Sequence, residues 1–355
     1  MTIPEDQTAM ADTVTAEREA ILVPSAPPVH DDAAAIREAQ LARRRKIVER
    51  IQGQGLLLVL VIVFVIMWIE SPFFMSVDNL LIAASVVSIL GIMAVVETLL
   101  IIAGEIDISI GSVMAVVSVL IGVFVGDGLD PWVASLVALI IAAGIGFANG
   151  ALVVWFKINS LVVTLGSYSI VLGIAYVLSN SSTVSLSGSN FGFLGSGDVW
   201  RIPIPLFIFL GLWLVAWGML KLTALGRHIY AVGDNYDAAV RAGVRANWLR
   251  IGLFVAMSAS AALAGIVVTS QLTASAPQIG NPYLLSVITA VILGGASLAG
   301  GRGTLFGTLI AVAILGVLQN GFALLALTEY TQYIVLGSLL ILAVLTDQLV
   351  RRVEP

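Results

Sequence analysis

Three carboxylates close together beside an apolar run are the groups best placed to do chemistry. Glu97 lies inside the run, and Glu105 and Asp107 follow at its end in the segment GEIDISIGS. A carboxylate at the bilayer centre costs about 2.5–3.5 kcal/mol on insertion scales, so such groups are usually functional. Proton or cation coupling is the chemistry they could support, but a coupled carrier is expected to bury a larger cluster. For Glu97 two alternatives stay open: access to water near the inner surface, or a helix-to-helix hydrogen bond or gating role.

The same segment also predicts the start of a helix. Glu105 and Asp107 precede a possible first turn at Ser109, where acidic groups favour the positive end of the helix dipole. Gly104 and Gly111 would permit a tight break. We favour structural capping over contact with a partner protein for this segment.

The sequence lacks the motifs of an enzyme. It contains no GxxxxGK[ST] phosphate loop, no H-E-x-x-H and no nucleophile–base pair of the hydrolase kind. It has no cysteine and only two histidines, His30 and His228, which argues against thiolate chemistry and against a His-ligated metal site. We therefore expect no catalysis, no metal or other cofactor, and no nucleic-acid partner.

The composition is that of a membrane protein. The chain of 355 residues is 59% hydrophobic and 11% charged, with a mean hydropathy of +1.04. Apolar runs of about 20 residues recur, the length that a helix needs to cross hydrocarbon, and they are continuous rather than alternating. The expected fold class is an all-α, polytopic membrane helix bundle of about ten transmembrane helices. The expected spans are 54–70, 79–103, 108–126, 131–155, 161–179, 203–222, 251–272, 283–299, 304–327 and 330–350.

Charge places both termini in the cytoplasm. Residues 1–42 are polar and proline-containing, which predicts a disordered cytoplasmic tail ahead of a transmembrane domain over 43–355. The basic run Arg43–Arg50 directly precedes the first apolar run and should stay inside. With ten spans, Arg201 is the one Lys or Arg of 17 that falls outside. The longest outer segment, 180–202, is rich in Ser and Gly, and it could either dock an extracellular partner or only connect two spans.

Small and polar residues occur inside several spans. Gly144, Gly146 and Gly150 should allow close helix contact. Most of the polar residues should be packing groups, but an uncharged, hydroxyl-rich solute would suit a path lined by some of them. The candidates for such a translocation path are Glu97, Asn149, Tyr168, Thr289 and Asn320.

The longest inner segment, LGRHIYAVGDNYDAAVRAGV (225–244), is a charged island between spans. Its second half predicts a two-turn helix over 235–242, capped by Asp234 or Asn235 and stopped by Gly243. Asp237 and Arg241 have the spacing of an ion pair. Small side chains, Ala238, Ala239 and Ala242, would let another protein approach. A helix this short is unstable alone, so we interpret it as an element that fits a partner, with an ordinary solvated loop as the alternative.

Four segments together resemble one family: IIAGEIDISIGSV (101–113), KINSLVVTLGSYSIVLGIAYVLS (157–179), ALGRHIYAVGDNYDAAVRAGV (224–244) and ITAVILGGASLAGGRGTLFGTLIAVAILGVLQNGF (288–322). The chain resembles the membrane permeases of bacterial ABC importers for simple sugars, which include ribose, xylose, galactoside and autoinducer-2 permeases. The resemblance covers about residues 50–350. Two departures stand out, because many relatives have Gly-Gly-Ile-Asp where this chain has Gly104 to Asp107, and an acidic residue and Ala where it has Tyr236 and Asp237.

The resemblance implies the pore subunit of an importer in the bacterial inner membrane that moves a monosaccharide or similar polyol. It implies a cytoplasmic ABC ATPase, a periplasmic or extracellular sugar-binding protein, and a second permease copy or paralogue, all within membrane lipid. A coupling loop at about 223–250 would then be seated on the ATPase. The residues assigned to that contact are Gly226, Arg227, Gly233, Asn235, Asp237, Ala238, Ala239, Arg241 and Gly243. The alternative function is a stand-alone secondary transporter or channel for a small neutral solute.

Overall fold

The computed structural model describes residues 55–186 and 190–353. Most of this part is helical, as expected for the fold class. The predicted disordered tail (1–42) and the basic run Arg43–Arg50 lie outside the described residues.

Helices occupy every range in which an apolar span was expected. The helices are Gly55–Glu70, α3 (Val77–Ile102), α4 (Ile110–Gly126), α5 (Pro131–Trp155), α6 (Ser160–Ser179), α8 (Ile204–Leu222), α11 (Ala246–Leu272), α12 (Asn281–Leu293), α13 (Leu305–Leu324) and α14 (Glu329–Val353). Six of these, α3, α5, α6, α8, α11 and α13, are long and apolar enough to cross a membrane. The other four contain shorter apolar stretches.

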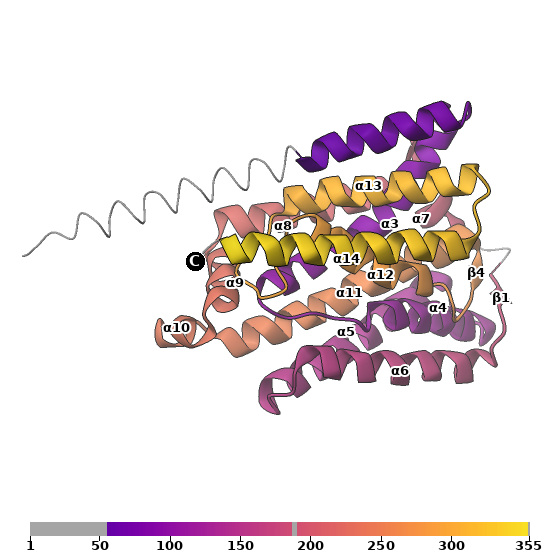
Figure 1. Cartoon of the computed structure of the whole chain (residues 1–355). Coiled ribbons are helices and arrows are strands. Elements are labelled where there is room, and N and C mark those ends of the chain that lie inside the picture. Colours follow the sequence, from indigo (N-terminus) through magenta and orange to yellow (C-terminus); the bar gives the residue numbers. More distant parts are fainter. Residues whose placement is uncertain (1–54, 187–189, 354–355) are drawn as a thin grey trace, which may run out of the picture. The chain divides into compact units, whose positions relative to one another are not determined.

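Short elements lie at the two ends of the helices (Figure 1). One end carries α9 (Ala224–Asp234) and α10 (Tyr236–Arg241), together with the end of α14. The other end carries η1 (Asn190–Gly192), α7 (Phe193–Ser196) and two small antiparallel pairs. In these pairs β1 (Val184–Ser185) joins β4 (Ala274–Ser275), and β2 (Asp198–Val199) joins β3 (Ile202–Pro203).

Local sequence accounts for most helix boundaries. The side chains of Ser76, Asp130 and Asn159 accept N–H hydrogen bonds in the first turns of α3, α5 and α6. The main difference from expectation is α12, which ends at Leu293 rather than at 299. The next turn places Gly295 at φ +90°, a conformation that breaks the helix, and residues 294–304 form an irregular turn instead.

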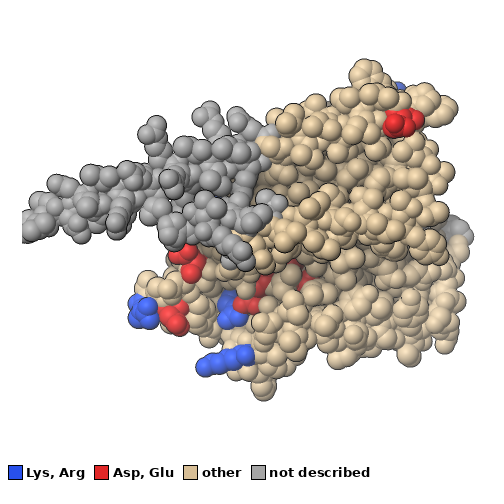
Figure 2. Space-filling view, in the orientation of Figure 1, with Lys and Arg blue, Asp and Glu red and all other residues tan. Residues whose placement is uncertain are grey.

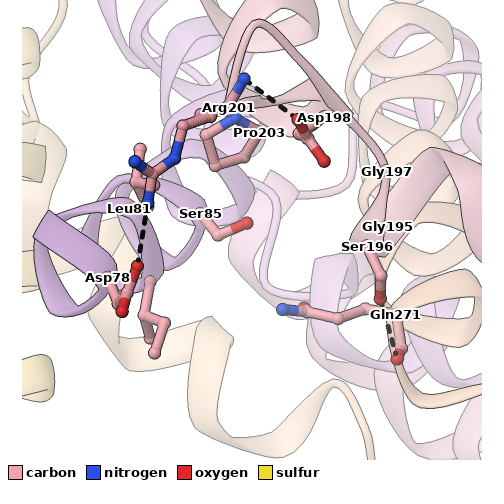
Figure 3. A pocket seen from close by; sticks show the side chains of 11 residues that line it. Asp78, Leu81, Ser85, Gly195, Ser196, Gly197, Asp198, Arg201, Pro203 and Gln271 are labelled. Carbon is pink, nitrogen blue, oxygen red and sulfur yellow. Dashed lines mark hydrogen bonds and ion pairs between the residues drawn. The ribbon is translucent and has the colours of Figure 1, made fainter.

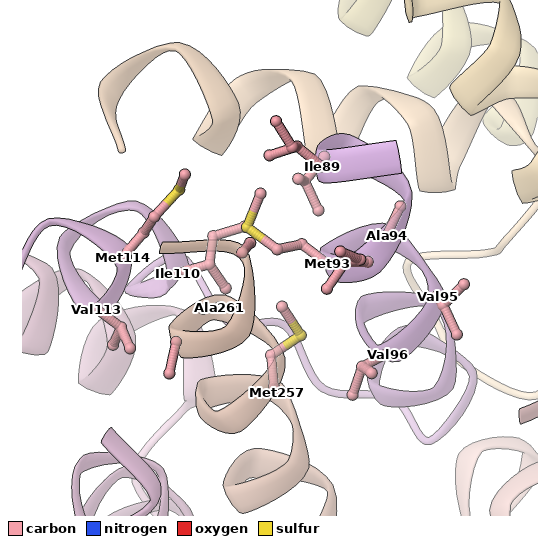
Figure 4. Close-up of a cluster of buried hydrophobic side chains, with 14 of the residues drawn as sticks. Ile89, Met93, Ala94, Val95, Val96, Ile110, Val113, Met114, Met257 and Ala261 are labelled. Atoms are coloured by element: carbon pink, nitrogen blue, oxygen red, sulfur yellow. The ribbon is translucent and has the colours of Figure 1, made fainter. Parts of the chain in front are cut away.

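The core is formed where α3, α4 and α11 meet. Figure 4 shows Met93 of α3, Met114 of α4 and Met257 of α11 around one buried cluster. Close packing of α11 on α5 depends on small residues, because a Cβ on Gly146 would lie 2.4 Å from the carbonyl oxygen of Phe254. This contact confirms the expectation for Gly146, whereas Gly144 has open space beside it. By contrast, α6 and α8 expose most of their apolar surface, as lipid-facing helices would.

Candidate functional site

The charged island forms two consecutive helices rather than one. Asn235 ends α9 and caps α10, where its side-chain oxygen accepts a hydrogen bond of 2.9 Å from the N–H of Ala238. Gly243 follows α10 at φ +86°. The predicted cap at Asn235 and the predicted glycine stop are therefore confirmed. Helix α9 was not predicted; it buries Ile229 and Val232, three residues apart, against the bundle.

The expected ion pair between Asp237 and Arg241 is wrong. In the described part of the chain no ion pair joins Asp237 to Arg241, whereas Arg201 pairs with Asp78 and Arg250 with Glu105. Asp237 and Arg241 are both exposed, where water and salt screening leave an ion pair little net stability. Both charges are thus free to meet another protein.

Some of the predicted coupling residues are exposed, and others are buried within the chain. The exposed ones are Arg227, Asn235, Asp237, Ala238, Arg241 and Gly243. Ala239 is buried against Val232 and Ala246, and Gly226 is buried against the backbone of Leu220. On the face shown in Figure 2, most charged side chains lie at the end that carries α9 and α10, a smaller charged group lies at the opposite end, and uncharged residues cover most of the face between them.

Gly233 holds α9 directly against two turns of the bundle. A Cβ at this position would lie 1.8 Å from the carbonyl oxygen of Ile102, at the end of α3, and 2.6 Å from the nitrogen of Gly301. The N–H of Gly301 donates to that same oxygen at 2.8 Å. In addition, the Tyr230 hydroxyl donates to the carbonyl of Gly303 at 2.8 Å. Helix α9, the end of α3 and the turn between α12 and α13 therefore meet backbone to backbone.

Arg250 provides a second link, from α10 to the turn between α3 and α4. Its guanidinium forms an ion pair with Glu105, and both side chains are largely buried. The same guanidinium lies 5.4 Å from the centroid of the Tyr236 ring, a cation–π distance. Tyr236 in turn donates from its hydroxyl to the side-chain oxygen of Asn247 at 2.6 Å. The two departures from the family pattern, Glu105 and Tyr236, thus contact one arginine.

The turn between α3 and α4 is a buried polar network. The Asp107 carboxylate accepts from the N–H and the hydroxyl of Ser109, at 2.8 and 2.5 Å, and Asn149 donates to the Ser109 hydroxyl at 3.1 Å. Glu97 accepts from the N–H of Asp107 at 3.2 Å. Burial raises the pKa of the Asp107 carboxyl to about 6, and the hydrogen bonds from Ser109 oppose that shift. Asp107 therefore orders the turn that precedes α4, but Ser109 at the N-cap of α4 makes no capping side-chain hydrogen bond, so the expected acidic cap of this helix is not found.

The position of Glu97 decides between its two alternatives. The side chain is completely buried, so the alternative in which it reaches water is wrong for this conformation. Its hydrogen bond comes from the backbone of the following turn and not from another helix, so the expected helix-to-helix bond is absent here, and a gating role stays a prediction.

The model of one family, described as the branched-chain amino acid transport system / permease component, matches residues 79–344. The chain belongs to this family. The ribose import permease protein of Escherichia coli (strain K12) is 37% identical to the permease over 298 residues, which cover 83% of this chain and 93% of the relative. The L-arabinose ABC transporter permease protein of Azospirillum brasilense is 31% identical over 84% of this chain and 88% of the relative. No solved structure matches the permease.

The permease does not bring its five candidate path residues together. Glu97 and Asn149 join through Asp107 and Ser109, as described above. Thr289 donates to Leu285 of its own helix. The two remaining candidates are Asn320, buried on α13, and Tyr168, half-buried on α6. A role for any of the five in lining a path stays a prediction.

Asn320 has a partner that the sequence did not suggest. Its amide donates to Asn79 of α3 at 2.9 Å, and the Asn79 amide donates back at 3.0 Å. Arg250 and Tyr230 were also missed as linking residues. The sequence did indicate a role for Arg250, because this arginine directly precedes an apolar span and a buried arginine needs a partner of opposite charge.

Proposed function

We propose that the permease forms the pore of an ATP-driven importer that carries a monosaccharide or a similar small polyol-like solute across the bacterial inner membrane. Its relatives are named as a ribose import permease, an L-arabinose ABC transporter permease and a D-allose transport system permease. The six long apolar helices, with four shorter ones beside them, support a multi-pass arrangement. We take all ten helices as spans with both termini cytoplasmic, on the charge distribution described above.

The coupling element in this proposal is the pair α9 and α10, and it would dock a cytoplasmic ABC ATPase. This assignment rests on the packing of Gly233, whose backbone contacts the end of α3 and the turn between α12 and α13. A push on α9 would therefore be transmitted to helices of the core without an intervening flexible side chain. Helix α10 is the part that remains exposed, with Asp237 and Arg241 unpaired in the described part of the chain.

Three other partners complete the importer. A periplasmic or extracellular sugar-binding protein would deliver the solute at the end opposite α9 and α10. A second permease copy or paralogue would supply the other half of the pore. Membrane lipid would cover the remaining apolar faces, including those of α6 and α8.

The coupling assignment is tested by charge reversal and by bulk at α10. Asp237→Arg and Gly243→Trp should abolish co-purification of the ATPase while leaving insertion of the permease in the membrane intact. The matched control is Asp127→Arg, a charge reversal at an exposed residue that follows α4. Wild-type yields of ATPase with both α10 variants would contradict the assignment.

The energy source separates the proposal from the alternative of a stand-alone secondary transporter. Proteoliposomes holding permease, ATPase and binding protein should take up sugar only with ATP inside. Uptake by the permease alone, driven by a proton or sodium gradient, would establish the alternative instead.

A further inference from the structure

A pocket of about 340 Å³ opens at the end of the molecule opposite α9 and α10. It lies between the start of α3, the segment from α7 to β3, and the end of α11 (Figure 3). Its polar lining residues are Asp78, Ser85, Ser196, Asp198, Arg201 and Gln271. The volume is at the lower end of the roughly 300–1,000 Å³ typical of small-molecule sites.

One wall of the pocket is a tight hairpin that holds Arg201 in place. Trp200 and Arg201 connect β2 to β3 at φ +53° and +69°, left-handed conformations that non-glycine residues adopt at a cost. The Asp198 carboxylate accepts from the N–H of Arg201 at 2.9 Å. The guanidinium then reaches across to Asp78, which it meets at 3.3 Å. The hairpin thus places the Arg201 side chain at the pocket, where it pairs with Asp78.

The opposite walls present polar groups that are free to bind a ligand. The Ser85 hydroxyl and the Gln271 amide face the pocket in Figure 3, and neither forms a side-chain hydrogen bond with the described residues. The Asp78 and Asp198 carboxylates each use one oxygen toward Arg201, which leaves the other oxygen available. The lining therefore offers carboxylate acceptors, a guanidinium donor, and hydroxyl and amide groups.

This set of groups fits a ligand whose atoms both donate and accept hydrogen bonds. Sugar hydroxyls do both, so carboxylates, amides and serine hydroxyls can each pair with them. With two carboxylates and one guanidinium, the lining carries a net negative charge, which disfavours an anionic ligand. The small volume of the pocket disfavours a long saccharide. We propose that this pocket binds a neutral polyol of monosaccharide size, with Ser85 and Gln271 as the residues that select for hydroxyls. The inference rests on the proposed function and adds a solute site on the permease itself.

The sequence contains no cysteine, so one introduced cysteine is the single thiol on the permease. Ser196→Cys places a unique thiol in the pocket, and Thr183→Cys places one on an exposed residue outside the pocket lining. The permease–ATPase complex is prepared in nanodiscs without the binding protein, and thiol labelling by a water-soluble maleimide is followed. The probes are D-ribose, L-arabinose and D-allose, and an uptake assay of the complete importer first identifies which of them is transported.

The transported sugar should slow labelling of the Ser196→Cys protein and leave the Thr183→Cys protein unaffected. Adding Ser85→Ala and Gln271→Ala to the Ser196→Cys protein should raise the sugar concentration needed for protection about tenfold, the effect of losing two neutral hydrogen bonds. Protection that is unchanged by these two substitutions would overturn the proposal.

Two further outcomes separate this inference from the proposed function. Uptake of a sugar by the importer without any protection of Ser196→Cys would overturn the pocket and leave the importer function standing. Loss of binding-protein docking in the Ser85→Ala/Gln271→Ala protein, again without protection, would mean that the pocket receives a protein rather than a sugar.

Discussion

Arg250 and Glu105 form an ion pair across 145 residues of sequence, and their side chains are only 18% and 9% exposed. Arg250 begins the apolar part of α11, and Glu105 lies in the turn that carries Asp107. The guanidinium also lies over the ring of Tyr236 in α10. A displacement of α10 must therefore shift Arg250 or break its contact with the ring, so the ion pair ties the exposed helix to the buried acidic turn.

Removing one member of this pair should destabilise the permease. Arg250→Met keeps an apolar side chain of similar reach and leaves the Glu105 carboxylate buried without its cation. The free energy of unfolding should fall by about 3 kcal/mol, because an unpaired buried charge loses its compensation. Denaturant unfolding in detergent micelles measures the change.

The chain contains its own control for this prediction. The Arg201–Asp78 pair is 72% and 85% exposed, so Arg201→Met should cost less than about 1 kcal/mol. Adding Glu105→Gln to Arg250→Met should recover part of the lost stability, since the orphaned charge is then gone. Equal losses for Arg250→Met and Arg201→Met would show that burial of the pair has no influence.

Tyr236 should affect energy coupling more than stability. Tyr236→Phe keeps a ring beneath Arg250 and loses only the hydroxyl that donates to Asn247, whereas Tyr236→Ala loses both contacts. A cation–π contact contributes about 0.5–2 kcal/mol, so the alanine variant should loosen α10 from α11. We expect fewer sugar molecules transported per ATP hydrolysed with Tyr236→Ala and nearly normal coupling with Tyr236→Phe. The ratio is measured in proteoliposomes; equal ratios for the two variants would exclude a role for the ring.

Gly233 should tolerate no side chain. In Gly233→Ala the new methyl would lie 1.8 Å from the Ile102 carbonyl oxygen, so α9 must move away from the end of α3. Overpacking of this kind costs about 1–3 kcal/mol and here would also separate the coupling element from the core. Both the thermal midpoint and ATP-driven uptake should fall.

Gly252→Ala is the matched control for that substitution. Gly252 lies in α11 with no atom within 4 Å of its would-be Cβ, so alanine should be neutral or stabilise the helix by up to about 1 kcal/mol. If Gly233→Ala and Gly252→Ala have the same thermal midpoint and the same ATP-driven uptake, the close packing of α9 on α3 is not needed for stability or transport.

Local signals in the sequence predicted the helices and the exposed end of the coupling element. The cap at Asn235 and the stop at Gly243 depend on neighbours within three residues, and both were predictable. The end of α12 was predicted too late because Gly294 and Gly295 continue an apolar run, and hydropathy does not register the backbone angle that stops the helix.

Contacts between distant segments were not predictable in the same way. Asn79 and Asn320 are 241 residues apart, and nothing in either segment specifies the other. Glu105 was identified as unusual, but its partner Arg250 became evident only from the packing of α11 against the turn. Gly226 and Gly233 were assigned to a partner surface because they lie in the charged island, whereas the structure packs them against the chain's own backbone.

Asp107 should make stability depend on pH. Its carboxyl is fully buried, with a pKa of about 6 against an ordinary value of 3.8. Between these two pH values the unfolded chain binds fewer protons than the folded one, so the contribution of Asp107 to stability decreases as pH rises from about 4 to above 6. The shift corresponds to about 3 kcal/mol. Asp107→Asn removes the titration and keeps an oxygen that can accept from Ser109.

The difference between the two proteins reports the Asp107 carboxyl together with its influence on the neighbouring Glu97, because every other titrating group is common to both. Relative to the wild type, Asp107→Asn should gain stability as the pH is raised from about 4 to about 7.5, with most of the gain complete just above pH 6. Unfolding midpoints across that range give the curve. A difference that stays constant with pH, or that shrinks as the pH rises, would mean that the Asp107 carboxylate is stabilised by its hydrogen bonds from Ser109 more than burial penalises it.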